Sequence, residues 1–186
     1  MAEPDAVGRT LDAIGRVNAE FCRLAVALAA VLIAGMTAIV LTGVFFRYVL
    51  NDSIAWAEDA SILAMIWVAF LVAPFGYRYG GHVSIELFVD MMPEPVMRIM
   101  RIVINILVLW ILFRFFTEAL GYVESGWRMR ANAIPLPISW FRMIVPVSFA
   151  ALMVIGLELI LRDLMTLVRP GRNYDLPQVT PAVEPE

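Results

Sequence analysis

The chain has 186 residues, of which 61% are hydrophobic, and its mean hydropathy is +0.80. This composition is more apolar than that of a soluble domain and indicates a membrane protein. The formal net charge is only −3, and no basic patch suggests nucleic acid as a partner.

Cysteine and histidine each occur once, which limits the disulfides, metal sites and haem sites that this chain can form. Cys22 alone forms no internal disulfide and no cysteine-based metal cluster. His82 alone provides neither a bis-histidine haem nor a histidine-rich metal site. The sequence also has no Ser/His/Asp set and no Gly-rich phosphate loop. We therefore expect no enzyme activity, no bound cofactor and no metal.

Residues 1–23 are mixed in character and begin with Glu3 and Asp5. A cleavable signal peptide instead has a short basic start followed by an apolar core. Apolar residues recur here at helical spacing, which predicts an amphipathic helix that lies on the membrane surface or leads into the first span. The alternative is a frayed polar lead. The apolar positions are Val7, Leu11, Ile14, Val17 and Phe21.

Four later segments are long and apolar enough to span a membrane, for which about 20 residues are needed. The third reaches that length only by including Arg114 and Glu118. An alternative count of three spans makes this segment re-entrant, but a helix satisfies its own backbone hydrogen bonds and a lipid-exposed loop does not. The predicted spans are residues 24–46, 55–77, 99–122 and 140–161.

The predicted fold is an all-α integral membrane protein with four transmembrane helices and an N-terminal amphipathic helix. A short interfacial helix over residues 83–92 would separate spans two and three. The organisation is then a lead over 1–23, a membrane domain over 24–168 and a Pro-rich, disordered tail over 169–186.

The arginines predict the orientation, because cytoplasmic loops carry the excess of positive charge. Nine arginines fall on the side of the two termini and four on the other side, which places both termini in the cytoplasm. Trp56, Trp127 and Trp140 then lie at the outer interface, as residues of an aromatic belt do.

Glu58 and Asp59 stand at the beginning of the second span. The helix macrodipole favours negative charge there and explains one carboxylate. Neighbouring residues point about 100° apart on a helix, so the two do not easily serve one partner. One carboxylate could pair with Arg47 at the end of the first span, and the other could contact a second protein.

Other polar residues within the spans have structural and functional interpretations. Arg114 and Glu118 share a helix face and are expected to pair, facing protein rather than lipid. Glu158 and Arg162 have the same spacing and are interpreted as an interfacial pair with no further role. Asn105 is expected to form a hydrogen bond between helices. Arg78 and His82 suit the negative end of the second span. Candidate interface or structural residues are Arg47, Trp56, Glu58, Asp59, Arg78, His82, Arg114 and Glu118.

Three stretches, in this order and spacing, resemble the small membrane subunit (DctQ-like) of tripartite ATP-independent periplasmic (TRAP) transporters. They are FRYVLNDSIAWAEDASILAMIWVAFLVAP (46–74), YRYGGHVSIE (77–86) and IPLPISWFRMIVPVSF (134–149). The chain departs from the family pattern at Asp59, Ile62-Leu63, Val72 and Glu86, so no specific salt bridge is transferred to this helix.

The resemblance implies a bacterial inner-membrane complex that takes up an organic acid by sodium symport. The implied partners are a large multi-spanning subunit, which carries the solute, and a periplasmic substrate-binding protein. The small subunit would support the large one as a scaffold without binding substrate. Two other classes stay open: a haem-free membrane anchor of an oxidoreductase, and a self-sufficient small transporter or channel.

Overall fold

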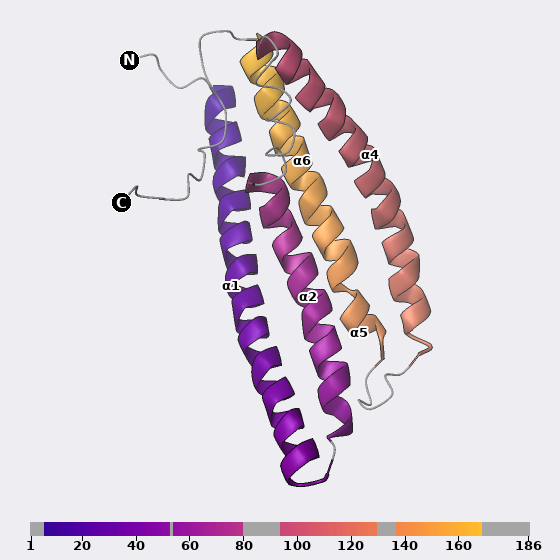
Figure 1. The fold of residues 1–186 in the computed structure, drawn as a ribbon. Helices are drawn as coiled ribbons and strands as arrows, with labels where there is room; N and C mark the ends of the chain where they lie inside the picture. The colour runs from indigo at the N-terminus through magenta and orange to yellow at the C-terminus, as the bar shows by residue number, and fades with distance from the viewer. Residues whose placement is uncertain (1–5, 53, 80–93, 130–136, 169–186) are drawn as a thin grey trace, which may run out of the picture.

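A computed structural model describes residues 6–52, 54–79, 94–129 and 137–168, and most of them are helical (Figure 1). The long helices run side by side. The beginning of α1 and the end of α6 lie at the same end of the bundle. The helices are α1 (Ala6–Val49), α2 (Ala55–Tyr79), α4 (Glu94–Gly126), α5 (Ser139–Arg142) and α6 (Ile144–Val168).

Four helices are long and apolar enough to cross a membrane, as the sequence predicts. The segment expected at 99–122 belongs to one helix, α4, so the re-entrant alternative with three spans is wrong. The predicted interfacial helix over 83–92, His82 and the tail over 169–186 lie outside the described residues. The four membrane-competent segments are Thr10–Val49, Ala55–Tyr79, Ile99–Gly126 and Ser139–Val168.

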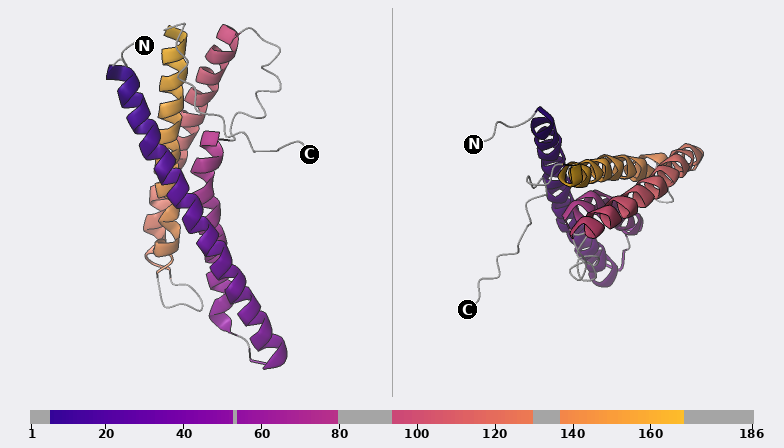
Figure 2. Two further views of the ribbon diagram at one scale, coloured as in Figure 1. Left: turned by 90° about the vertical axis from the view of Figure 1, so that its left-hand side faces the viewer. Right: turned by 90° about the horizontal axis from the view of Figure 1, so that it is seen from above.

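The helices are arranged in the order α1, α2, α6, α4 across the bundle. α6 is central, because it contacts α1, α2 and α4, and it is the most buried of the four long helices. α4 lies at one edge and packs mainly on α6. Figure 2 shows that α1 crosses the others obliquely and that the α1–α2 turn extends beyond the end of α4.

α1 is one uninterrupted helix of 44 residues. The lead therefore continues directly into the first span, and within the described residues it does not lie on the membrane surface as a separate helix. Its inward face also differs from the apolar face expected from the sequence: Val17 is 69% exposed, and apart from Leu11 the buried positions are small or polar. These buried positions recur every three or four residues and are Leu11, Gly15, Asn18, Cys22, Ala25 and Ala29.

Pro74 lies within α2 and is buried. Proline has no N–H to donate to the carbonyl four residues earlier, which is that of Phe70. The Ser148 hydroxyl of α6 donates to this Phe70 oxygen at 2.7 Å. A side chain of the neighbouring helix thus satisfies the orphaned carbonyl, as a bilayer interior requires.

Aromatic rings fill the middle of the bundle. Phe149 of α6 packs edge to face on Phe70 of α2, with ring centroids 6.0 Å apart, and stacks on Phe115 of α4 at 5.7 Å. Nearer the end that holds Ala6, Cys22, Ile155 and Leu159 form a buried apolar cluster. The polar groups described next lie beside this cluster.

Candidate functional site

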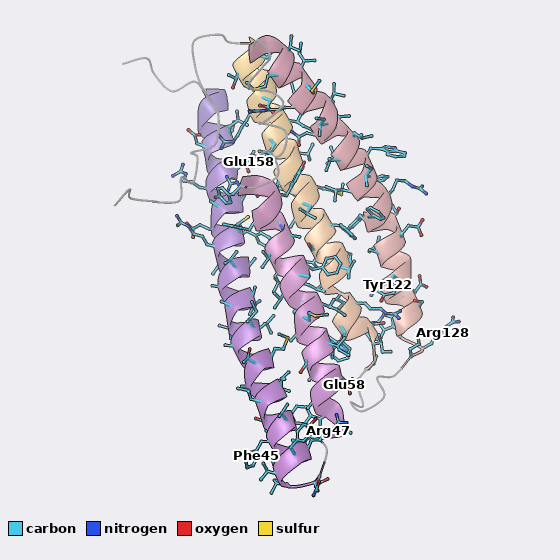
Figure 3. All side chains as sticks on the ribbon, viewed as in Figure 1. Phe45, Arg47, Glu58, Tyr122, Arg128 and Glu158 are labelled. Atoms are coloured by element: carbon cyan, nitrogen blue, oxygen red, sulfur yellow. The ribbon has the colours of Figure 1, made fainter. Side chains whose placement is uncertain are left out.

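Glu158 is the centre of a group of buried polar side chains from three helices. Its side chain is 0% exposed. Glu158 Oε2 accepts a hydrogen bond from Asn18 Nδ2 of α1 at 2.7 Å. Glu158 Oε1 accepts from Arg78 Nη2 of α2 and from Arg162 Nε of α6, both at 3.0 Å. We call Asn18, Arg78, Glu158 and Arg162 the buried charge cluster; Figure 3 shows Glu158 between α1 and α6.

Both arginines of the cluster also bind the backbone of α1. Arg78 Nη2 donates to the Gly15 carbonyl oxygen at 2.8 Å, and Arg162 Nη2 donates to that of Leu11 at 3.3 Å. Arg78 Nη1 additionally donates to the Tyr79 hydroxyl at 3.3 Å. A buried ion pair is tolerated only when further hydrogen bonds satisfy its remaining donors and acceptors. The cluster therefore fixes the lead of α1 against α2 and α6.

Gly15 makes this close approach possible. A Cβ atom at position 15 would overlap Arg162 Nη2 and would lie 2.9 Å from Glu158 Oε1. Both are polar atoms of the cluster, so even a methyl group would displace a charged side chain. Gly15 therefore leaves the space that the ends of the Arg162 and Glu158 side chains occupy.

A second polar contact links α2 to α4 beside the cluster. The Tyr77 hydroxyl donates to Asn105 Oδ1 at 2.9 Å, and Asn105 is 1% exposed. Gly156 of α6 leaves room for this contact, because a Cβ there would lie 3.2 Å from the Tyr77 hydroxyl oxygen. The hydrogen bond between helices that was expected of Asn105 is confirmed.

These contacts change the interpretation of two candidate residues. Arg162 and Glu158 form the expected pair, but Glu158 is buried between the helices and also binds Asn18 and Arg78. Arg78 is 4% exposed, and its hydrogen bonds go to α1, α6 and Tyr79 instead of capping the carbonyls of its own helix. The sequence did contain a signal for the contact between Arg78 and Glu158. The two residues have opposite charges and stand near the ends of two predicted spans that meet the same side of the membrane.

The opposite end of the bundle carries the predicted pair of carboxylates. Glu58 lies in the first turn of α2 and is exposed, as is Arg47 near the end of α1 (Figure 3). Asp59 is half-buried, and Trp56 is 49% exposed. Within the described ranges no ion pair joins Arg47 to either carboxylate, so the pairing suggested from the sequence is not formed.

Arg114 and Glu118 form the expected pair on α4, with 3.9 Å between Arg114 Nη2 and Glu118 Oε1. Their side chains are 63% and 77% exposed, so they do not face the helices of this chain.

A corner between α4 and α5 was not foreseen from the sequence. Arg142 Nη1 donates to the Tyr122 carbonyl and to Ser125 Oγ, both at 3.0 Å, and its guanidinium lies 3.9 Å from the centre of the Tyr122 ring. The Ser139 hydroxyl donates to the Val123 carbonyl at 2.7 Å. These bonds reach carbonyls near the end of α4, which runs to Gly126. Arg142 and Ser139 thus tie the end of α4 to the helix that follows it.

Comparison with known proteins bears on what this bundle is. Residues 36–166, more than half of the chain, match the family described as the DctQ component of tripartite ATP-independent periplasmic transporters. The chain belongs to the DctQ family. The match begins at Met36 within α1, so Asn18 of the buried charge cluster and the neighbouring Gly15 precede it.

Two DctQ relatives show the extent of the similarity. The C4-dicarboxylate TRAP transporter small permease protein DctQ of Vibrio cholerae serotype O1 is 25% identical over 76 residues, which are 41% of this chain and 33% of that protein. A Haemophilus influenzae protein named among TRAP transporter small permease proteins is 30% identical over 78 residues, 42% of this chain and 48% of that protein. The matched segments span between a third and about half of these relatives' lengths.

Proposed function

We propose that this chain acts as the small membrane subunit of a bacterial TRAP transporter for an organic acid and sodium ions, and that it is a scaffold for the large transport subunit. The observation that carries the scaffold role is the buried charge cluster, which bonds α1, α2 and α6 to one another through a single carboxylate. A network of this kind favours one fixed helix arrangement. It leaves the outer faces of the bundle available for a partner.

The polar groups also argue against a solute path through this chain alone. The cluster and the Tyr77–Asn105 contact are engaged between helices, while Arg114 and Glu118 point outward. A path would need polar groups that line a common channel. Membership of the DctQ family likewise disfavours the oxidoreductase anchor.

The proposed location is the bacterial inner membrane, with both termini in the cytoplasm. The excess of arginine on the side of the termini supports this orientation. Trp127 and Trp140 support the position of the bundle across the membrane: both are about half exposed and lie edge to face at the end of the bundle opposite Ala6. An aromatic pair at this level is typical of the membrane–water interface.

The proposed partners are the large multi-spanning TRAP subunit and a periplasmic substrate-binding protein. The test is a mild-detergent pull-down of the tagged chain from its native membrane, followed by reconstitution with and without the co-purified proteins. We expect a large multi-spanning protein at equal stoichiometry and solute uptake only by the complete assembly. Recovery with a soluble redox subunit, or uptake by liposomes that contain this chain alone, would overturn the proposal.

The carboxylates at the start of α2 are proposed as part of the outer contact surface. One negative charge is enough for the dipole of α2, so the second carboxylate is proposed to contact a partner. Glu58→Gln combined with Asp59→Asn should therefore weaken assembly with the large subunit or docking of the binding protein. The measurement is co-purification and uptake, with Glu124→Gln as the control at an exposed carboxylate near the same end. Unchanged assembly and uptake would leave these residues with a structural role only.

A further inference from the structure

α4 carries two opposite faces with different chemistry. Its inner face is a seam that repeats every seven residues and packs toward α6, formed by Asn105, Leu112, Ala119 and Gly126. At 3.6 residues per turn, Arg114 lies on the side opposite this seam. The outer stripe shares that side and consists of Leu107, Trp110, Arg114, Thr117, Glu118 and Gly121, all of them exposed.

The charges of the outer stripe lie at bilayer depth. Counted at 1.5 Å per residue, Arg114 is about 20 Å along α4 from Trp127 and about the same distance from Arg101. The hydrocarbon layer is about 30 Å thick, so a residue midway between these two flanks falls within it. Charged side chains at this depth are costly and almost always face protein or water rather than lipid.

The two charges leave much of their bonding capacity open. Their 3.9 Å separation exceeds the usual length of a charge-assisted hydrogen bond. Within the described residues neither side chain makes a hydrogen bond, and the Thr117 hydroxyl binds the backbone oxygen of Arg114. Arg114 therefore offers donors, and Glu118 offers acceptors, to a group outside this chain.

The exposed face of α1 provides the contrast. Leu28, Val31, Val40 and Leu41 are 45–68% exposed there, and the stretch from Leu24 to Phe46 contains no charge. Such a surface suits lipid tails. The α4 stripe differs in carrying charge. Gly121 on the stripe lets another helix approach closely, a property that it shares with Gly35 of α1.

We propose that the outer stripe of α4 is the docking surface for a transmembrane helix of the large subunit that carries a hydrogen-bonding side chain, such as an amide, hydroxyl or carboxylate, at the depth of Arg114 and Glu118. This inference rests on the proposed function and specifies which face makes the contact. Pairing with a polar partner helix supplies the bonds that lipid tails cannot.

The first experiment is site-specific photo-crosslinking in the intact complex. A benzophenone amino acid replaces Trp110 on the stripe or, as the control, Val31 on the apolar face of α1. We expect the probe at position 110 to crosslink to the large subunit and the probe at position 31 not to do so. Crosslinking only from position 31, crosslinking to a second copy of this chain, or adducts with lipid alone would each overturn the inference.

A second experiment removes the charges. Arg114→Leu with Glu118→Leu should lower recovery of the large subunit by about tenfold, which corresponds to about 1.4 kcal/mol. Arg23→Leu with Glu20→Leu, at an exposed pair on α1, should leave it unchanged. If wild-type chain recovers no large subunit, the proposed function fails. If the leucine variant recovers it fully, only the docking surface fails.

Discussion

Glu158 has three hydrogen-bond donors from three helices, and this arrangement makes a fully buried carboxylate tolerable. The balance is sensitive, because two buried guanidinium groups share the Glu158 carboxylate. Removing one partner of a buried ion pair leaves an uncompensated charge, whereas exposed pairs are worth little. The stability of the bundle should therefore respond far more to this carboxylate than to those on the surface.

Glu158→Gln should lower the free energy of unfolding by about 3–5 kcal/mol, because Arg78 and Arg162 lose a shared negative charge while they stay buried. The measurement is reversible unfolding of the purified chain in mixed micelles. Glu20→Gln is the matched control. Glu20 pairs with Arg23 at the surface at 2.9 Å, close to the 3.0 Å between Glu158 and Arg162. Equal losses for both variants would show that burial of the cluster does not matter.

Gly15→Ala should destabilise the chain by about 1–3 kcal/mol, which is typical of overpacking, because the new methyl group meets Arg162 and Glu158. Gly35→Ala on the same helix has nothing within 4 Å of the new atom. That variant should be neutral or more stable by up to about 1 kcal/mol, from helix propensity alone. Thermal unfolding of both variants checks the difference, and equal effects would contradict the proposed steric role.

At the residue scale the sequence predicted pairs but not the cluster. Arg162–Glu158 and Arg114–Glu118 follow from helical spacing, which is local information. The contact of Arg78 with Glu158 joins positions 80 apart and depends on how α2 and α6 are rotated and shifted against each other. Without those rotations, Arg78 was assigned to its own helix end, where a positive charge is also favourable.

The inward face of α1 illustrates what the sequence indicates at the scale of an element. The usual reading of an amphipathic helix places its apolar face inward, because water surrounds the protein. Lipid tails reverse this preference, and membrane helices pack through small and polar residues. Gly15, Asn18 and Ala25 accordingly face the bundle, while Val17 and Leu24 face outward. The presence of four long apolar helices was predicted well because the length of an apolar run is itself the signal.

The contact between Ser148 and the backbone of α2 should be energetically coupled to Pro74. Ser148→Ala should cost about 1 kcal/mol, because the Phe70 carbonyl loses its donor within the bilayer. In a Pro74→Ala background the N–H of residue 74 replaces that donor, so the loss should shrink. A double-mutant cycle on the free energy of unfolding measures the coupling. A cost of Ser148→Ala that is the same in both backgrounds would rule out this account of α2.

For the whole molecule, orientation is the property that most needs a direct measurement. Arg128 and Asp12 are exposed at opposite ends of the bundle, whereas the native Cys22 is 0% exposed. Arg128→Cys should react with a membrane-impermeant maleimide in spheroplasts, and Asp12→Cys should react only after permeabilisation. A Cys22→Ala background removes any residual labelling of the native thiol. The reverse pattern would place both termini in the periplasm.

The length of α1 has a consequence for the surrounding bilayer. Its 44 residues extend about 66 Å, more than twice the hydrocarbon thickness, and the turn that joins it to α2 reaches beyond the end of α4 (Figures 1 and 2). Its charge-free stretch, Leu24 to Phe46, is about 35 Å long and fits the hydrocarbon layer with a modest tilt. The charged part of α1 before Leu24 adds about 27 Å, and the buried charge cluster holds this part against α2 and α6. The bilayer beside α1 therefore needs no unusual thickness, and the molecule extends rigidly past its surface at the end that holds Ala6.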